Sequence, residues 1–159
     1  MESIEQLIQA LEASGAAGYI RKSRWSHAVL DAVHIFGIAL TVGAAIPLSL
    51  RLLSVWRTIP AEAVARVLVP CAATGLVIAA GSGVLLFSVR ATEYADLRIF
   101  QVKLGLIAGA VLFALLIHLR YGLRLDEASP KHRELHAIIS ILCWVGALAC
   151  GRLIAFVGD

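Results

Sequence analysis

The sequence predicts an all-α protein, an integral membrane four-helix bundle preceded by a short amphipathic helix at the membrane interface. The first observation is composition, because 60% of the 159 residues are hydrophobic and only 16% are charged. Soluble domains contain roughly 45–50% apolar and about 25% charged residues. The second observation is the mean hydropathy of +0.86. The third is that the apolar residues form long segments, each with the roughly 20 residues that a membrane-spanning helix requires.

The apolar segments define four predicted spans, separated by short runs where charged residues gather. These spans cover approximately residues 25–53, 64–89, 99–119 and 135–157. The dipeptide Ser129-Pro130 is a turn signal between the last two spans. Residues 25–159 are therefore predicted to form one domain of four membrane helices. The surrounding lipid bilayer is its expected binding partner.

The first 24 residues have a different pattern and are expected to form an interfacial helix and a hinge. Ile4, Leu7, Ile8 and Leu11 recur at helical spacing, with three glutamates on the opposite face. This pattern is typical of a helix that lies on the membrane surface with its apolar side in the lipid. Residues 15–18 begin and end with glycine and are expected to be the hinge into the first span.

The distribution of Lys and Arg predicts the orientation of the bundle. Four spans place both termini on one side, which carries five basic residues, against seven on the other side. The positive-inside rule then favours both termini outside the cytoplasm. The basic residues lie at helix ends and form no separate basic surface, so nucleic-acid binding is not expected.

Ionisable side chains inside the first span are the most informative residues, because such groups are costly in lipid and usually face the bundle interior. His27, Asp31 and His34 are four and three residues apart and so share one helical face. Arg51 lies at the end of the same span. We assign His27, Asp31 and Arg51 to an intramembrane polar cluster, and we treat His34 as a candidate ligand.

The third and fourth spans carry matching polar faces. Lys103 and His118 lie on one face of the third span, and His136 shares a face of the fourth span with Cys143 and Cys150. His118 ends its span and His136 begins the next, so these two histidines are expected to face each other at similar depth. The cysteines are odd in number and intramembrane, which argues against a disulfide framework.

Histidines that project inward from facing helices of a four-helix bundle are a common way to hold haem. We therefore predict His34, His118 and His136 as candidate ligands of a haem b iron. Lys103 and Arg152 are candidates to pair with the propionates. His118 with His136 is the cleanest axial pair, and His34 needs a partner from another helix. The structural alternative is that each histidine makes an interhelical hydrogen bond.

The sequence also resembles an uncharacterised family of small bacterial four-helix inner-membrane proteins. The resemblance begins at Asp31-Ala-Val-His34-Ile-Phe-Gly37 and continues through Phe100-Gln-Val-Lys103 to Gly151-Arg152-Leu-Ile-Ala155. This family is loosely similar to the membrane domain of copper-resistance protein D and to cytochrome b561-like bundles. The resemblance implies a bacterial inner-membrane location and a haem or redox role. It singles out five positions: His34, Arg51, Lys103, His118 and Arg152.

The first functional hypothesis is therefore a haem-b-binding or redox-linked membrane protein, which would act in electron transfer as a cytochrome b-like subunit. Its expected partners are a quinone or a periplasmic redox protein. The second hypothesis is a non-catalytic subunit or assembly factor in a homo- or hetero-oligomer. The third is a small ion or metal permease that uses His34, Asp31 and Lys103 as a relay. The sequence has no nucleophile–base motif, phosphate loop or zinc signature, which disfavours hydrolase or kinase activity.

Overall fold

The computed structural model describes residues 2–123 and 125–157 and confirms the all-helical bundle. Four of its helices are long and apolar enough to cross a membrane. Each begins and ends within a few residues of its predicted span. Their bounds are α3 (Arg24–Leu52), α4 (Ala61–Ser88), α6 (Arg98–Tyr121) and α7 (Pro130–Val157).

The fourth membrane helix begins earlier than hydropathy alone predicts. α7 starts at Pro130 and not near residue 135. Proline is favoured in the first turn of a helix, because its missing N–H would have no intrahelical acceptor there. The polar residues that follow Pro130 therefore belong to the helix, although they lie outside the apolar segment. A short 3₁₀ turn, η1 (Leu125–Glu127), lies between α6 and α7.

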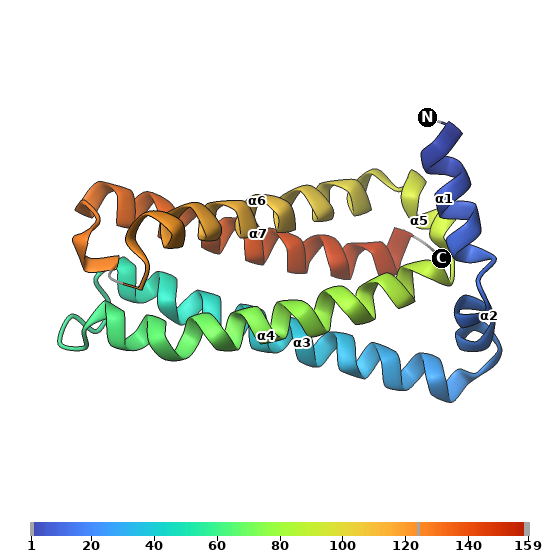
Figure 1. Ribbon diagram of the computed structural model, residues 1–159, viewed down its shortest axis with the longest axis horizontal. Coiled ribbons are helices and arrows are strands. Elements are labelled where there is room, and N and C mark those ends of the chain that lie inside the picture. The colour runs from blue at the N-terminus through green and yellow to red at the C-terminus, as the bar shows by residue number, and fades with distance from the viewer. Residues whose placement is uncertain (1, 124, 158–159) are drawn as a thin grey trace.

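Three short helices lie at the end of the bundle that carries both termini. They are α1 (Glu2–Glu12), α2 (Gly15–Lys22) and α5 (Ala91–Asp96). α1 runs across this end, transverse to the long helices (Figure 1), and its residues Ile4 and Leu7 are exposed. Such a placement suits a helix at the membrane surface.

The predicted hinge at residues 15–18 is wrong, because these residues form the first turn of α2. The hydroxyl of Ser14 accepts a hydrogen bond from the Ala17 N–H at 3.3 Å and so caps the helix. The chain therefore turns at Ala13 and Ser14. The two glycines suggest a hinge, but the serine before them supplies the N-cap of a helix.

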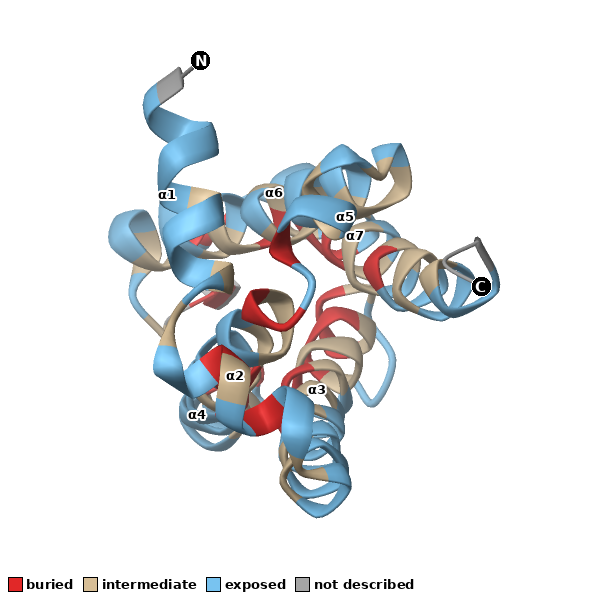
Figure 2. Cartoon of the chain, turned by 90° about the vertical axis from the view of Figure 1, so that its right-hand side faces the viewer, coloured by how far each residue is buried: buried red, intermediate tan, exposed pale blue. Residues whose placement is uncertain are grey.

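The long helices pack as two hairpins. α3 packs along α4, α6 packs along α7, and α3 also contacts α7 to join the hairpins. The end-on view shows these two pairs on opposite sides of the bundle (Figure 2). The main apolar core lies at the end far from the termini, where Leu52, Ala65, Ile117 and Leu125 are buried.

Two glycines allow α3 and α4 to approach backbone to backbone. A Cβ atom on Gly37 would lie 2.5 Å from the Ala79 nitrogen, and a Cβ atom on Gly75 would lie 2.6 Å from the Thr41 nitrogen. Both distances are too short for any side chain. Small residues at a helix crossing are a usual basis of helix association in lipid. The α3–α4 crossing therefore depends on both glycines.

Candidate paired-histidine site

The first candidate histidine, His34, is bound by the neighbouring helix of its own hairpin. Its Nδ1 lies 2.9 Å from the carbonyl oxygen of Ala79 and 3.1 Å from the hydroxyl of Ser82. A carbonyl oxygen can only accept, so Nδ1 carries the proton. The Ser82 hydroxyl in turn donates to the Ile78 carbonyl at 2.6 Å. His34 therefore makes an interhelical hydrogen bond that stabilises the α3–α4 hairpin.

Gly83 leaves the space that the His34 ring occupies. A Cβ atom on Gly83 would lie 2.9 Å from Cε1 of His34. The segment from Ala79 to Gly83 thus supplies an acceptor, a hydroxyl and a gap for one imidazole. With the proton on Nδ1, the lone pair of His34 Nε2 is not used by any hydrogen bond in the described part of the chain.

His118, on α6, is held by its own helix in the same tautomer. Its Nδ1 donates to the carbonyl of Ala114, one turn earlier, at 2.8 Å. Its Nε2 is buried, and no described group of the protein is within hydrogen-bonding reach. Histidines that bind metals commonly donate one ring N–H to a carbonyl and present the other nitrogen to the metal. His118 has this arrangement.

His136 lies on α7 and is more fully buried, with 9% of its surface exposed. Both of its ring nitrogens are buried and lack a partner among the described residues. The His118 ring lies near the His136 ring, and the Phe113 carbonyl is nearby but outside hydrogen-bonding geometry. This placement agrees with the prediction that the two histidines face each other across the α6–α7 hairpin.

Three buried ring nitrogens without partners are unusual, because nearly all buried polar atoms in native proteins are hydrogen-bonded. Each unsatisfied buried group costs roughly 1–3 kcal/mol. His118 and His136 therefore form a site with three buried ring nitrogens that have no hydrogen-bond partner in the described chain. We call this pair the paired-histidine site.

The two cations predicted to serve haem propionates lie elsewhere. Lys103 packs against α7, where its Nζ is 3.5 Å from the position of a Cβ on Gly151. It precedes His118 by 15 residues of the same helix, a separation of roughly 22 Å. Arg152 is exposed, and its guanidinium lies 4.9 Å from the ring centroid of Phe156. The structure does not bring Lys103 and Arg152 to the paired-histidine site.

The predicted cluster of His27, Asp31 and Arg51 does not form. His27 and Asp31 are exposed near the start of α3, whereas Arg51 is buried at its other end and donates from Nε to the Ile59 carbonyl. The 24 residues from His27 to Arg51 span roughly 36 Å of helix. The shared spacing shows that these residues lie on one face of α3. It does not show where along the helix that face packs against neighbouring helices, and this packing begins only near His34.

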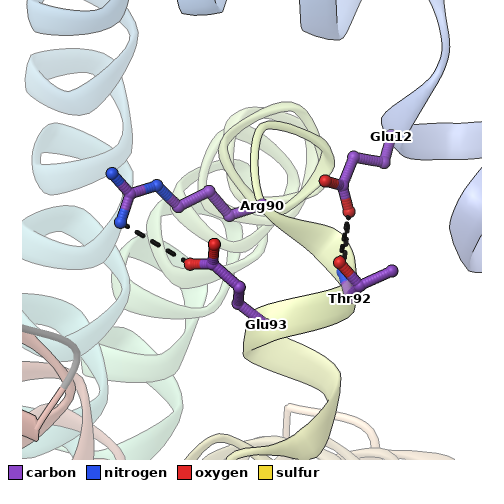
Figure 3. A network of polar contacts seen from close by, with 4 residues as sticks. All are labelled: Glu12, Arg90, Thr92 and Glu93. Atoms are coloured by element: carbon purple, nitrogen blue, oxygen red, sulfur yellow. Dashed lines mark hydrogen bonds and ion pairs between the residues drawn. The ribbon is translucent and has the colours of Figure 1, made fainter.

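At the end of the bundle that carries the termini, the carboxylate of Glu12 joins α1 to α5 through hydrogen bonds (Figure 3). Glu12 accepts hydrogen bonds from the backbone N–H of Thr92 at 2.9 Å and from its hydroxyl at 2.7 Å. These bonds hold the pKa of Glu12 below its ordinary value of 4.5, with a further contribution from the Arg21 charge. Beside them, Arg90 and Glu93 form an ion pair at 3.6 Å.

The fold and site together define a helical protein with four helices able to cross a membrane and a buried pair of histidines. A sequence model of the family of unknown function DUF6644 matches residues 11–157, and the chain belongs to that family. The match includes α2 to α7 and both histidines of the site. No curated protein and no solved structure matches the chain.

Proposed function

We propose that this protein is a redox-linked membrane protein whose cofactor is held by His118 and His136, and that the cofactor is haem b. The observation that carries the proposal is the set of buried ring nitrogens at the paired-histidine site, which have no partner in the described chain. Bound haem b supplies one-electron chemistry at its iron, and imidazole nitrogens are common axial ligands. Two imidazoles from facing helices are the donor type that haem iron takes, and α6 and α7 would have to separate at that level to admit the ring.

The role of the chain is to position the two ring nitrogens. The Ala114 carbonyl keeps the proton of His118 on Nδ1, so Nε2 is the atom available as a ligand. Ile117 and Ala137, the sequence neighbours of the two ligands, are buried in the apolar core. This core excludes water from the site and fixes the level at which α6 and α7 meet.

His34 is a structural residue in this proposal. Its Nδ1 bonds the Ala79 carbonyl across the α3–α4 contact, and its helix position is far from the loop end where His118 and His136 lie. Lys103 is likewise too far from the pair to bind propionates of a haem held there. The proposal therefore keeps two of the three predicted ligands and neither of the two predicted propionate partners.

Close packing of α6 and α7 favours a second candidate function, the handling of a single metal ion. A porphyrin between His118 and His136 requires these helices to separate at that level, whereas one ion does not. No three His, Cys, Asp or Glu side chains of the described residues gather into a metal site. Among common metals, Cu(I) accepts as few as two ligands and is compatible with imidazole. The candidate is therefore a Cu(I)-binding membrane protein.

The location that we propose is a bacterial inner membrane, with both termini in the periplasm. Support comes from the excess of basic residues at the loops opposite the termini. In this orientation the paired-histidine site lies near the cytoplasmic face. A quinone diffusing in the bilayer reaches that level, so a quinone is the preferred electron partner over a periplasmic protein.

The test is spectroscopy and metal analysis of the purified protein, expressed with ample haem and copper. Haem b gives a Soret band and sharp α and β bands after dithionite reduction. We expect His118→Ala and His136→Ala to abolish these bands while the variants still elute as monodisperse protein. His132→Ala is the matched control, because His132 lies on the same helix as His136 but is exposed.

The outcomes separate the two candidates. A colourless protein that binds one copper per chain, and loses it in the same two variants, supports the Cu(I) function over haem. A protein with neither haem nor copper overturns both. Loss of colour in His34→Ala with retention in His118→Ala would show that the site is assigned to the wrong hairpin.

A further inference from the structure

An apolar groove lies at the lipid-facing side of the terminal end of the bundle. Its volume is about 460 Å³, and its lining includes Ile20, Trp25, Val29, Val33 and Leu85. The lining runs along α3 from Trp25 to Val33, a length of roughly 12 Å at the helical rise. Leu85 of α4 forms part of the lining, and Ile20 places α2 at the end nearest the terminus. The groove is thus shallow and open, and its lining follows the start of α3.

The groove offers no polar group to a ligand along its length. Ser26 is the polar residue of its lining, and its hydroxyl donates to the Ser23 hydroxyl at 2.9 Å. The remaining lining is aliphatic or aromatic, so the groove is suited to an apolar chain. Trp25, with 85% of its surface exposed, stands at the end of the groove near the predicted membrane boundary. Tryptophan is enriched at that level of a bilayer.

Basic residues gather at the junction of α2 and α3, next in sequence to the groove residues Ile20 and Trp25. Arg21, Lys22 and Arg24 lie just before or at the start of α3, and residues 13–30 contain no Asp or Glu. Arg21 donates to the Glu12 carbonyl at 3.2 Å. Lys22 and Arg24 make no hydrogen bond or ion pair within the described residues. The mouth of the groove is therefore positively charged and has two basic side chains available.

We propose that this groove is a specific binding site for an anionic phospholipid. One acyl chain lies along α3 between Trp25 and Val33, and the phosphate is bound by Lys22 and Arg24. The charge at the mouth selects this occupant over a zwitterionic lipid or a quinone, whose headgroups carry no net negative charge. Basic residues next to a membrane helix attract anionic lipids in this way. The site is separate from the paired-histidine site and does not depend on the proposed function.

The test is native mass spectrometry of the full chain, delipidated in mild detergent and titrated with phosphatidylglycerol or phosphatidylcholine of identical acyl chains. We expect one phosphatidylglycerol to bind at least five-fold more tightly than phosphatidylcholine. The double variant Lys22→Gln/Arg24→Gln should remove that preference. Its control is Arg57→Gln/Lys131→Gln, which removes two exposed charges at the opposite end of the bundle and should leave the preference intact.

A second pair of variants tests the groove itself. Val29→Trp fills the groove from within its lining and should weaken binding of both lipids. Val77→Trp adds the same bulk at an exposed position of α4 outside the groove and should change neither affinity. Equal affinity for the two lipids, insensitivity to Val29→Trp, or a co-purifying quinone in place of phospholipid would each overturn the proposal.

Discussion

The two helical hairpins differ in the hydrogen bonds that their histidines make. In the α3–α4 hairpin, His34 bonds the Ala79 carbonyl across the helix interface, and the Thr41 hydroxyl bonds the Gly37 carbonyl at 2.9 Å. In the α6–α7 hairpin, His118 and His136 leave three buried ring nitrogens without a described partner. The same residue type therefore stabilises one hairpin and weakens the other. A polar residue within a span is a candidate for ligand binding only after its own hydrogen bonds have been counted.

The largest expected effect comes from breaking the α3–α4 contact at its closest point. Gly37→Leu places a side chain where a Cβ atom already lies 2.5 Å from the Ala79 backbone. Because neither backbone can move without separating the helices, we expect a loss of at least about 3 kcal/mol. Unfolding in mixed detergent micelles measures this loss. Gly43→Leu is the control on the same helix, since nothing lies within 4 Å of a Cβ there. A similar loss in both variants would contradict the proposed backbone crossing.

A smaller effect isolates the contact between His34 and Gly83. Gly83→Ala brings a Cβ atom to 2.9 Å from the imidazole Cε1, and we expect a destabilisation of about 1–2 kcal/mol. In a His34→Ala background the same substitution should be nearly neutral, because the ring is absent. The double-mutant cycle should therefore show a coupling of about 1 kcal/mol. A coupling near zero would mean that the His34 ring does not rest on Gly83.

The comparison predicts opposite signs for histidine replacement in the two hairpins. His34→Ala removes an interhelical hydrogen bond and should cost about 1 kcal/mol of stability. His136→Leu in cofactor-free protein replaces two unsatisfied nitrogens by apolar atoms and should be neutral or stabilising by up to about 1 kcal/mol. Both are measured as shifts in the unfolding midpoint. Marked destabilisation of cofactor-free His136→Leu would indicate a hydrogen bond at that ring and remove the main support for the site.

The smallest effect concerns the attachment of α1. The lowered pKa of Glu12 means that its contribution to stability is present at neutral pH and is lost as pH falls from 4.5 through the lowered pKa. Hydrogen exchange of the α1 amides should therefore accelerate in acid. In the Glu12→Gln variant the α1 amides should exchange faster at neutral pH. Their exchange should then show little pH dependence beyond that of intrinsic exchange. Glu5→Gln, a charge-matched control on the same helix, should behave as the unmodified protein does.

Much of the fold was predictable from the sequence, because the cost of placing charge in lipid makes apolar segments easy to recognise. The inward faces of the spans were also predictable where the neighbouring helices run alongside. His118 and His136 lie on such faces, since Ala110 on the His118 face of α6 is buried, and so are Ser140 and Ala147 on the His136 face of α7. Periodicity is a property of one helix, and it was sufficient for these positions.

Properties that depend on a second helix were not predictable. The partner of His34 is a backbone carbonyl of Ala79, which has no signature in the sequence. Gly75 was one of many small residues in the second span, and only the crossing with Gly37 distinguishes it. His27 and Asp31 were expected to point inward, yet the neighbouring helices do not cover the start of α3. The position of the neighbouring helix, and not the spacing of residues along one helix, decided these cases.

The glycine crossing of α3 and α4 has a consequence for biosynthesis. Its two helices precede α6 and α7 in the chain, so they emerge from the ribosome first. Their interface requires no residue from the later half, because the crossing and the His34 bond lie wholly between α3 and α4. The first hairpin can therefore assemble as a finished unit during translation. The second hairpin then docks through α3, and the paired-histidine site is completed last.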